Sequence, residues 1–281
     1  MKDLTIFVSS CDTYSDIWES FFTCFKKFYH YQGEPIILNT ESKHFSFEGL
    51  NIKTFAHFNS SEKVEWGERL LYHLKQVETE YVLFLLDDFF FRRKVDMETI
   101  QRNLTTMKNN NDIIYFSYSL VDDDANSNCE YADFLLRGQK GKYKLNAQAA
   151  LWRTSDLIKL TQPSDNPWDW EDYGTRRLWY TNRKCYCVKS EGSVIDYGKV
   201  GLYWSIVRGK WVIDDVKPFF DDMNIKIDFT KRGVFTSLND YDKSLRAVVM
   251  RLPQTIRINC INFYKRRKNN YLGKRYLKEN G

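Results

Sequence analysis

Two adjacent aspartates, Asp87 and Asp88, lie in the middle of the otherwise apolar stretch YVLFLLDDFFF, residues 81–91. Carboxylates at the mouth of a buried strand repel each other and lose hydration, which is costly unless a cation or hydrogen bonds compensate. Mg²⁺ and Mn²⁺ favour carboxylate oxygens and leave coordination positions open for phosphate. The pair therefore predicts either a divalent-metal site or aspartates that cap a turn, and these two residues alone do not separate the alternatives.

A second acidic group lies among tryptophans in the segment NPWDWEDYGTRRLW, residues 166–179. Its acids are Asp169, Glu171 and Asp172. A low local dielectric raises the pKa of a carboxyl group and suits it to general-base chemistry, while the faces of tryptophan rings suit sugar rings. The alternative is the acidic first turn of a helix, which complements the helix dipole, with Arg176 and Arg177 as surface partners.

Two further segments carry charge. In VRGKW, Arg208 and Lys210 flank Gly209, and closely spaced cations beside a permissive glycine suit a diphosphate, although RGK also occurs on ordinary surfaces. The segment VDDDANSNCE, residues 121–130, is acidic without apolar neighbours and is typical of a solvated loop.

The elements that must position these residues alternate along the chain. Apolar runs predict strands at 4–8, at 34–42 and at 81–86, with helices over 18–28 and 64–77 between them. This order predicts a mostly parallel sheet covered by helices, in which ligands bind at the carboxyl ends of the strands. One crevice then gathers residues that follow the three strands: Ser9, Ser10, Asp12, Thr40, Glu41, Asp87 and Asp88. Further apolar runs predict a strand at 111–119 and a strand turning into a helix at 143–160.

Composition limits the class of protein. A chain of 281 residues with 43% hydrophobic residues, 13 Gly and 5 Pro can build a sizeable core and is not of low complexity. No signal peptide is apparent and no apolar run reaches the roughly 18 residues of a membrane span, so we expect a cytoplasmic protein. The 6 Cys lack zinc-like spacing and are expected to be reduced thiols.

The net charge of +5 hides a basic C-terminal segment. Residues 243–278 contain eleven Lys or Arg and no acid, so the rest of the chain carries a net charge of −6. Apolar residues alternate with these cations, which predicts a basic helical extension over 236–281 behind a domain at 1–235. The extension either packs on the body or lies on an anionic membrane surface, which would place the protein peripherally on the inner face of the cell membrane.

Several of these segments, in this order, resemble the bacterial glycosyltransferases of polysaccharide synthesis that are related to family 2 and have the GT-A fold. The resemblance rests on TIFVSSCDTYSDIW, TES, WGERLLYHL, EYVLFLLDDFFF, NPWDWEDYGTRR, VRGKW and KRG, and it spans roughly residues 4–235. It implies a GT-A-like, Rossmann-type mixed sheet flanked by helices. It also implies a nucleotide-sugar donor and a saccharide acceptor, expected to be lipid-linked, for capsule, O-antigen or exopolysaccharide synthesis.

The resemblance also implies roles for individual residues. Asp88 would bind Mn²⁺ or Mg²⁺, although Leu86 stands where a DxD motif has its first acid. Glu171, or else Asp172, would be the catalytic base, with inversion of the anomeric centre. The remaining assignments are donor contacts by Ser9, Asp12, Glu41, Arg69, Asp87, Arg208 and Lys210, and acceptor contacts by Trp168, Asp169 and Trp170.

Two other functions stay open from the sequence. Asp88, Glu171 and Asp172 could bind two metals for phosphodiester cleavage, with the basic extension on nucleic acid, although base-stacking modules are missing and no nucleic-acid partner is expected. A carbohydrate-binding protein without catalysis is the third possibility.

Overall fold

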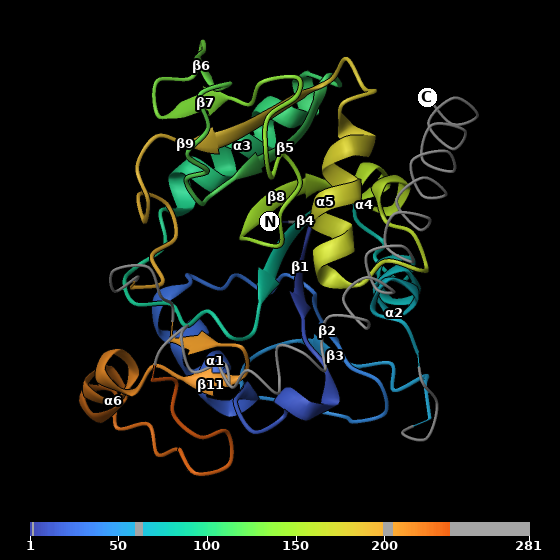
Figure 1. The fold of residues 1–281 in the computed structure, drawn as a ribbon. Coiled ribbons are helices and arrows are strands. Elements are labelled where there is room, and N and C mark those ends of the chain that lie inside the picture. The colour runs from blue at the N-terminus through green and yellow to red at the C-terminus, as the bar shows by residue number, and fades with distance from the viewer. Residues whose placement is uncertain (2, 60–63, 199–204, 237–281) are drawn as a thin grey trace, which may run out of the picture.

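The computed structural model describes residues 1, 3–59, 64–198 and 205–236. Within these residues nine strands form one mixed sheet in the order β3-β2-β1-β4-β8-β5-β9-β7-β6 (Figure 1). The strands are β1 (Leu4–Ser9), β2 (Ile36–Asn39), β3 (Ile52–Lys53), β4 (Tyr81–Leu86), β5 (Ile113–Ser117), β6 (Ser127–Asn128), β7 (Phe134–Leu136), β8 (Ala150–Arg153) and β9 (Lys184–Val188). β3, β2, β1 and β4 run parallel, while β8 is antiparallel to both β4 and β5.

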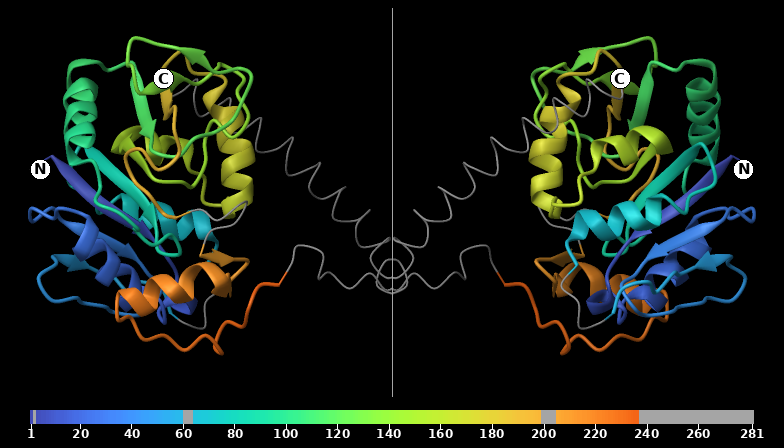
Figure 2. Two further views of the ribbon diagram at one scale, coloured as in Figure 1. Left: turned by 90° about the vertical axis from the view of Figure 1, so that its left-hand side faces the viewer. Right: turned by 90° about the vertical axis from the view of Figure 1, so that its right-hand side faces the viewer.

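Helices cover both faces of the sheet (Figures 1 and 2). On one face lie α1 (Trp18–Phe28) and α3 (Met97–Asn109), and on the other α2 (Trp66–Leu74), α4 (Thr154–Leu160) and α5 (Pro167–Leu178). Alternate residues of a strand point to opposite faces, so Leu83 and Leu85 join the first core and Val82 and Phe84 the second. The predicted fold class, a mixed α/β sheet flanked by helices, is confirmed.

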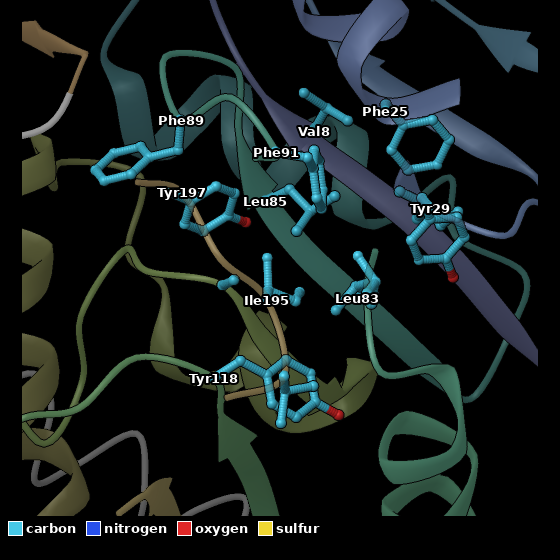
Figure 3. Close-up of a cluster of buried hydrophobic side chains, with 14 of the residues drawn as sticks. Val8, Phe25, Tyr29, Leu83, Leu85, Phe89, Phe91, Tyr118, Ile195 and Tyr197 are labelled. Atoms are coloured by element: carbon cyan, nitrogen blue, oxygen red, sulfur yellow. The ribbon is translucent and has the colours of Figure 1, made fainter. Parts of the chain in front are cut away.

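The first core is rich in aromatic rings. Phe25 of α1 stacks on Tyr29 with ring centroids 4.6 Å apart, and Phe91 packs against both Phe25 and Tyr197 (Figure 3). Phe89, Phe90 and Phe91, which directly follow the aspartates, are all buried. These rings therefore anchor the segment after Asp88 and fix the end of β4.

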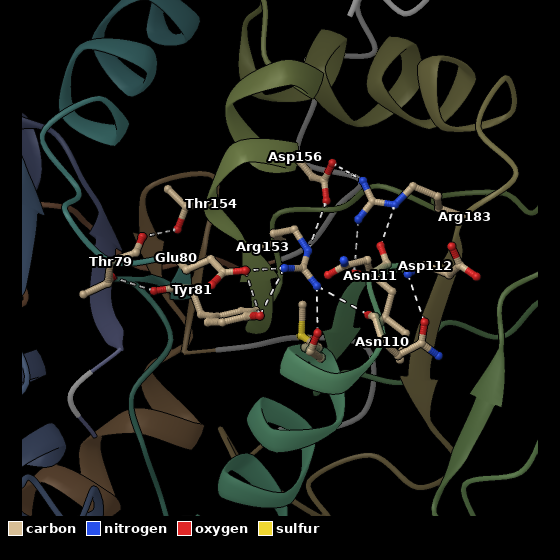
Figure 4. A network of polar contacts seen from close by, with 12 residues as sticks. Thr79, Glu80, Tyr81, Asn110, Asn111, Asp112, Arg153, Thr154, Asp156 and Arg183 are labelled. Carbon is tan, nitrogen blue, oxygen red and sulfur yellow. Dashed lines mark hydrogen bonds and ion pairs between the residues drawn. The ribbon is translucent and has the colours of Figure 1, made fainter. Parts of the chain in front are cut away.

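A charged network ties the elements at the opposite edge of the sheet (Figure 4). Arg153 at the end of β8 donates to Oε1 of Glu80 at 2.5 Å and to the carbonyl of Met107 at 2.8 Å. Asp156 accepts from Arg183. Because Glu80 precedes β4 whereas the aspartates follow it, this network stabilises the fold and lies away from the candidate site.

The last described segment is residues 205–236. It contains the hairpin of β10 (Ile206–Val207) and β11 (Lys210–Trp211) and the helix α6 (Ile213–Asp222). Arg232 Nε donates to Oδ2 of Asp16 at 2.9 Å, which fastens the segment to the loop after β1. The predicted extension at 236–281 and its proposed membrane contact at 243–278 lie outside the described residues apart from residue 236.

Two smaller expectations can be compared with the structure. Cys11, Cys24, Cys129, Cys185 and Cys187 are free thiols, as expected, and Cys260 lies outside the described residues. Among the described residues, none of the helices combines the length and the apolar character needed to cross a bilayer.

Candidate active site

The site forms where the strand order reverses. β2 and β4 both pair with β1, on its two sides, and such a switch point opens a crevice beyond the carboxyl ends of the strands. Ser9 ends β1, and Asp87 and Asp88 follow β4 directly. The fold therefore brings Ser9 to the same edge of the sheet as Asp87 and Asp88, which lie 78 and 79 positions further along the chain.

Asp87 is held rigidly in this crevice. It is 3% exposed, its Oδ2 accepts a hydrogen bond from Oγ of Ser10, and the indole Nε1 of Trp18 donates to the same oxygen at 3.2 Å. Burial, together with the nearby charge of Asp88, raises the pKa of Asp87 well above its usual value. The carboxyl group is thus fixed in orientation, and the charge of Arg232 offsets the effect of burial only in part.

Asp88 is half-buried beside it. Burial raises the pKa of Asp88 to about 6. The nearby positive charge of Arg232 acts in the opposite direction and lowers this pKa. Tyr14 lies close to these groups: its ring is 4.1 Å from the Arg232 guanidinium. Burial, together with the negative charges of Asp88 and Asp87, raises the pKa of the Tyr14 hydroxyl to about 12. The aspartate pair is therefore partly, not fully, compensated by the protein.

A cavity of about 860 Å³ opens onto both aspartates. It brings together seven of the predicted site residues: Ser9, Arg69, Asp87, Asp88, Trp168, Glu171 and Arg208. Tyr14, Trp66 and Gln148 also line it. A volume of this size is ordinary for a small-molecule site that admits a ligand with several polar groups.

Glu171 enters the cavity from α5. Its Oε1 accepts a hydrogen bond from the backbone amide of Ala147 at 2.9 Å, while burial raises its pKa above the usual value. Asn166 caps α5 by accepting from the amide of Asp169 at 2.9 Å. Asp165, fully buried, binds Arg177 in α5 through two hydrogen bonds of 2.6 and 2.7 Å, so both ends of the helix segment are fixed.

Arg208 reaches the cavity from a strained turn. Arg208 and Gly209 form the two-residue turn between β10 and β11, with φ values of 53° and 76°. Such hairpin turns need positive φ at both positions and favour Asn-Gly, since the left-handed conformation is unfavourable for a residue with a Cβ. An arginine kept in this conformation at the wall of a cavity points to a functional constraint.

Other predicted residues lie outside this cavity. The carboxylate of Asp12 accepts from the amides of Glu41 and Ser42 at 3.0 Å each, and Glu41 forms an ion pair with Arg69. Asp12 and Glu41 thus join the loops after β1 and β2 and hold Arg69 in place, whereas a direct donor contact stays a prediction. Lys210 is exposed on β11.

The predicted acceptor residues separate. Trp168 is 77% exposed at the cavity mouth, and Asp169 and Asp172 line a neighbouring cavity, where Asp172 pairs with Arg176 at 3.0 Å. Trp170 is a correction: it is fully buried, and its Nε1 donates to Thr161 at 3.0 Å. The indole of Trp170 offers no surface to a sugar, because helical periodicity turns it toward the sheet.

No protein-family model matches the chain, and no curated protein matches its sequence. Among solved structures, S. aureus TarS residues 1–349 in complex with UDP-GlcNAc is similar with a TM-score of 0.46 and 12% identity, over 83% of this chain and 69% of that one. The mannosyltransferase PcManGT from Pyrobaculum calidifontis, in complex with GDP-Man and Mn²⁺, is similar with a TM-score of 0.47 and 10% identity, over 80% and 65%.

A bifunctional IspDF from Campylobacter jejuni is also similar, with a TM-score of 0.38 and 9% identity over 69% of this chain and 51% of that one. The ligands named here belong to those proteins. Solved structures similar to the chain thus include a mannosyltransferase and a protein bound to a nucleotide sugar.

The carboxyl groups at the cavity suit a divalent cation whose remaining coordination positions are filled by a bound ligand. No group of three or more His, Cys, Asp or Glu side chains that could hold a metal occurs in the part of the chain that the structure describes. Mg²⁺ sites often use one or two carboxylates together with substrate phosphates. Two adjacent carboxyl groups with raised pKa values at one cavity fit that arrangement, and Asp88, which is more exposed than Asp87, would be the direct ligand.

Sequence reasoning missed three supporting residues. Trp18 begins the helix predicted at 18–28 and had no predicted site role, although its Nε1 donates to Oγ of Ser10 at 2.6 Å. Tyr14 and Arg232 were not assigned to the site, although Tyr14 lines the cavity and Arg232 moderates the charge of both aspartates. The segment KRG contained the only available signal for Arg232, and its partner Asp16 is 216 positions away.

Proposed function

We propose that this protein is a glycosyltransferase that moves a sugar from a nucleotide-diphosphate donor to a saccharide acceptor. One observation carries the proposal: a single cavity joins Asp87 and Asp88 at the strand switch point with Glu171 and Arg208. Acidic groups that suit a cation, a guanidinium that suits a diphosphate and a carboxyl group of raised pKa are the parts that glycosyl transfer needs.

Each residue then has a defined task. Asp88 would hold Mn²⁺ or Mg²⁺, and a bound cation would supply positive charge for the departing diphosphate. Arg208 donates to the diphosphate oxygens, aided by Lys210, and Asp87 lies nearby to contact the ribose. Ser9 and Arg69 line the donor pocket. Asp12 and Glu41 hold Arg69 in place and so shape the part of the pocket that binds the nucleoside.

Glu171 acts as the general base. Burial keeps its carboxyl group poorly hydrated, so the carboxylate accepts a proton readily from an acceptor hydroxyl. The hydrogen bond from the Ala147 amide orients one oxygen and leaves the other for the hydroxyl. Attack from the face opposite the leaving diphosphate inverts the anomeric centre, and the configuration of the product determined by NMR tests this step.

The biological setting is a further part of the proposal. The resemblance points to capsule, O-antigen or exopolysaccharide synthesis with a lipid-linked acceptor. The basic segment 243–278 supports a peripheral position on an anionic membrane face, where such acceptors lie. Co-sedimentation with anionic and neutral vesicles, with and without residues 237–281, tests the membrane contact.

The rival functions make different demands. Phosphodiester cleavage by two metals was predicted to use Asp88, Glu171 and Asp172, but Asp172 lines the neighbouring cavity and pairs with Arg176. A binding protein without catalysis would keep its affinity when Glu171 is replaced by Gln, and it would show no turnover in the unchanged protein.

A panel of nucleotide sugars, with and without Mn²⁺ or Mg²⁺, tests the donor. A ligand that binds the folded state raises the melting temperature. We expect at least one nucleotide sugar to raise it, with a larger shift when the metal is present. Absence of a shift across the panel would overturn the donor assignment.

A further inference from the structure

A second cavity, of about 530 Å³, continues from the candidate active site along α5. Trp168 and Glu171 line both cavities, so the two are contiguous. Residues from every turn of α5 line it, and so does the helix C-cap; these residues are Trp168, Asp169, Glu171, Asp172, Tyr173, Thr175, Arg176 and Trp179. From Trp168 to Trp179 the helix rises about 16 Å, so the cavity is an elongated groove that is longer than one monosaccharide.

Aromatic side chains line this groove and are exposed. Trp168 is 77% exposed and Tyr143 is 61% exposed, while Trp179 is half-buried at the far end with its Nε1 donating to the carbonyl of Gly141 at 3.4 Å. Large aromatic rings left in water at the wall of a cavity mark a ligand surface. Between the rings lie Asp172 and Arg176, which can exchange their mutual hydrogen bonds for hydroxyl groups.

Tyr143 provides a second, independent observation. Its φ value is 46°, in the left-handed region, and an aromatic residue is unfavourable there. Its ring nevertheless lines the groove together with Lys142. A strained backbone that presents an exposed ring to a cavity is the arrangement expected when a position is constrained by binding.

We propose that this α5 groove, bounded by Tyr143, Trp168 and Trp179, binds the acceptor as an oligosaccharide, with sugar units beyond the reacting one stacked on Tyr143 and Trp179. The proposal rests on the proposed glycosyl transfer and deepens it by naming the acceptor class. The reacting hydroxyl lies at Glu171, where the two cavities meet, and the remote units extend toward the C-terminal end of α5. Binding energy from these units then serves to position the reacting one.

A glycan array that displays bacterial saccharides of one to six units tests the proposal on the full chain. We expect the unchanged protein to bind at least one glycan of three or more units more tightly than its terminal monosaccharide. Trp179→Ala and Tyr143→Gly should each weaken that binding on the order of tenfold. Tyr143→Gly also relieves the left-handed strain, so its melting temperature should not fall and loss of binding cannot be attributed to unfolding.

Tyr180→Ala is the matched control, because Tyr180 is 53% exposed and follows Trp179 but does not line the groove. The proposal is overturned if no oligosaccharide is bound more tightly than its monosaccharide, or if both groove variants bind as the unchanged protein does. Thermal shifts with nucleotide sugars distinguish failure of the groove proposal from failure of the proposed function. The groove variants should keep the shift that donor binding causes. If the proposed function is wrong, the donor shifts should be absent while binding to the glycan array is kept.

Discussion

Trp18 Nε1 donates to Oδ2 of Asp87 at 3.2 Å, so a helix of the core directly orients a carboxylate of the candidate site. The same N–H lies 2.6 Å from Oγ of Ser10, which itself donates to Asp87. Three residues from the loop after β1, from α1 and from the end of β4 thus form one buried network. Such networks hold a group in place when every member is satisfied.

Replacing Trp18 by Phe should loosen this network. The ring packing is largely kept, but the buried Asp87 loses a donor, which costs about 1–3 kcal/mol of unfolding free energy. Trp152→Phe is the matched control, because Trp152 is also buried and its Nε1 has no hydrogen-bond partner in the described part of the chain. Denaturant unfolding compares the two, and equal losses would show that the hydrogen bond contributes nothing.

Replacing Arg208 by Asn should separate stability from binding. Asn suits the first position of this turn, so we expect the melting temperature to stay level or rise. Loss of the cation at the cavity should weaken nucleotide-sugar binding about tenfold, as for one charge-assisted contact. Arg208→Lys keeps both charge and strain and should retain more affinity than Asn, and calorimetric titration measures all three proteins. Unchanged affinity in Arg208→Asn would exclude a donor contact.

Replacing Glu171 by Gln should reduce turnover by about 10²–10⁴-fold with little effect on donor affinity, because the base is removed and the shape is kept. Asp172→Asn should have a much smaller effect, since Asp172 pairs with Arg176 in the neighbouring cavity. Steady-state rates and donor titrations on both variants decide between the two acids. A larger loss in Asp172→Asn would transfer the assignment to Asp172.

Activity should also depend on pH through Glu171. A base must be deprotonated, and burial raises the pKa of Glu171 above its usual value. The rate should therefore rise with pH, with a midpoint above that of an exposed glutamate. A profile that is flat from pH 4 to 8 would contradict a catalytic role for this group.

Asp88 predicts how stability varies with pH in the absence of metal. Its pKa rises from 3.8 to about 6 on folding, so the folded state keeps the proton to higher pH than the unfolded state. The contribution of this group to stability is complete below pH 3.8 and is lost as pH increases toward 6. Asp88→Asn should therefore raise the melting temperature by about 2–4 °C at pH 7.5 and leave it unchanged at pH 3.5.

Mn²⁺ provides the complementary test of Asp88. We expect Mn²⁺ with a bound nucleotide sugar to raise the melting temperature of the unchanged protein more than that of Asp88→Asn. Equal shifts would mean that the cation does not bind at Asp88. The same scan on Asp172→Asn provides a control in which a carboxylate outside the main cavity is removed.

Gly67 should tolerate no side chain. A Cβ at this position would lie 2.1 Å from the carbonyl oxygen of Gln162, so α2 would have to move from the segment before α5. At Gly174 a Cβ would meet the methyl groups of Leu145, the nearest at 2.8 Å, and these can rotate away. Gly67→Ala should therefore lower the melting temperature more than Gly174→Ala, and a smaller loss at Gly67 would contradict this packing.

The local pattern of apolar residues predicts much of the fold. The apolar runs before Ser9 and Asp87 correctly predicted β1 and β4, since a strand buried on both faces is apolar at nearly every position. The antiparallel insertion of β8 between β4 and β5 was not predicted, and β9 with its two cysteines was overlooked. Pairing of that kind depends on contacts between distant segments, which hydrophobic period alone does not encode.

The sequence by itself determined that acids follow a buried strand and that another acid stands among tryptophans. Only the tertiary structure decided that Asp88, Glu171 and Arg208 share one cavity, that Trp170 belongs to the core and that Asp12 supports a loop. The physical reason is that residue type and local period fix which groups a segment presents, whereas their separation and burial depend on how the sheet and helices pack.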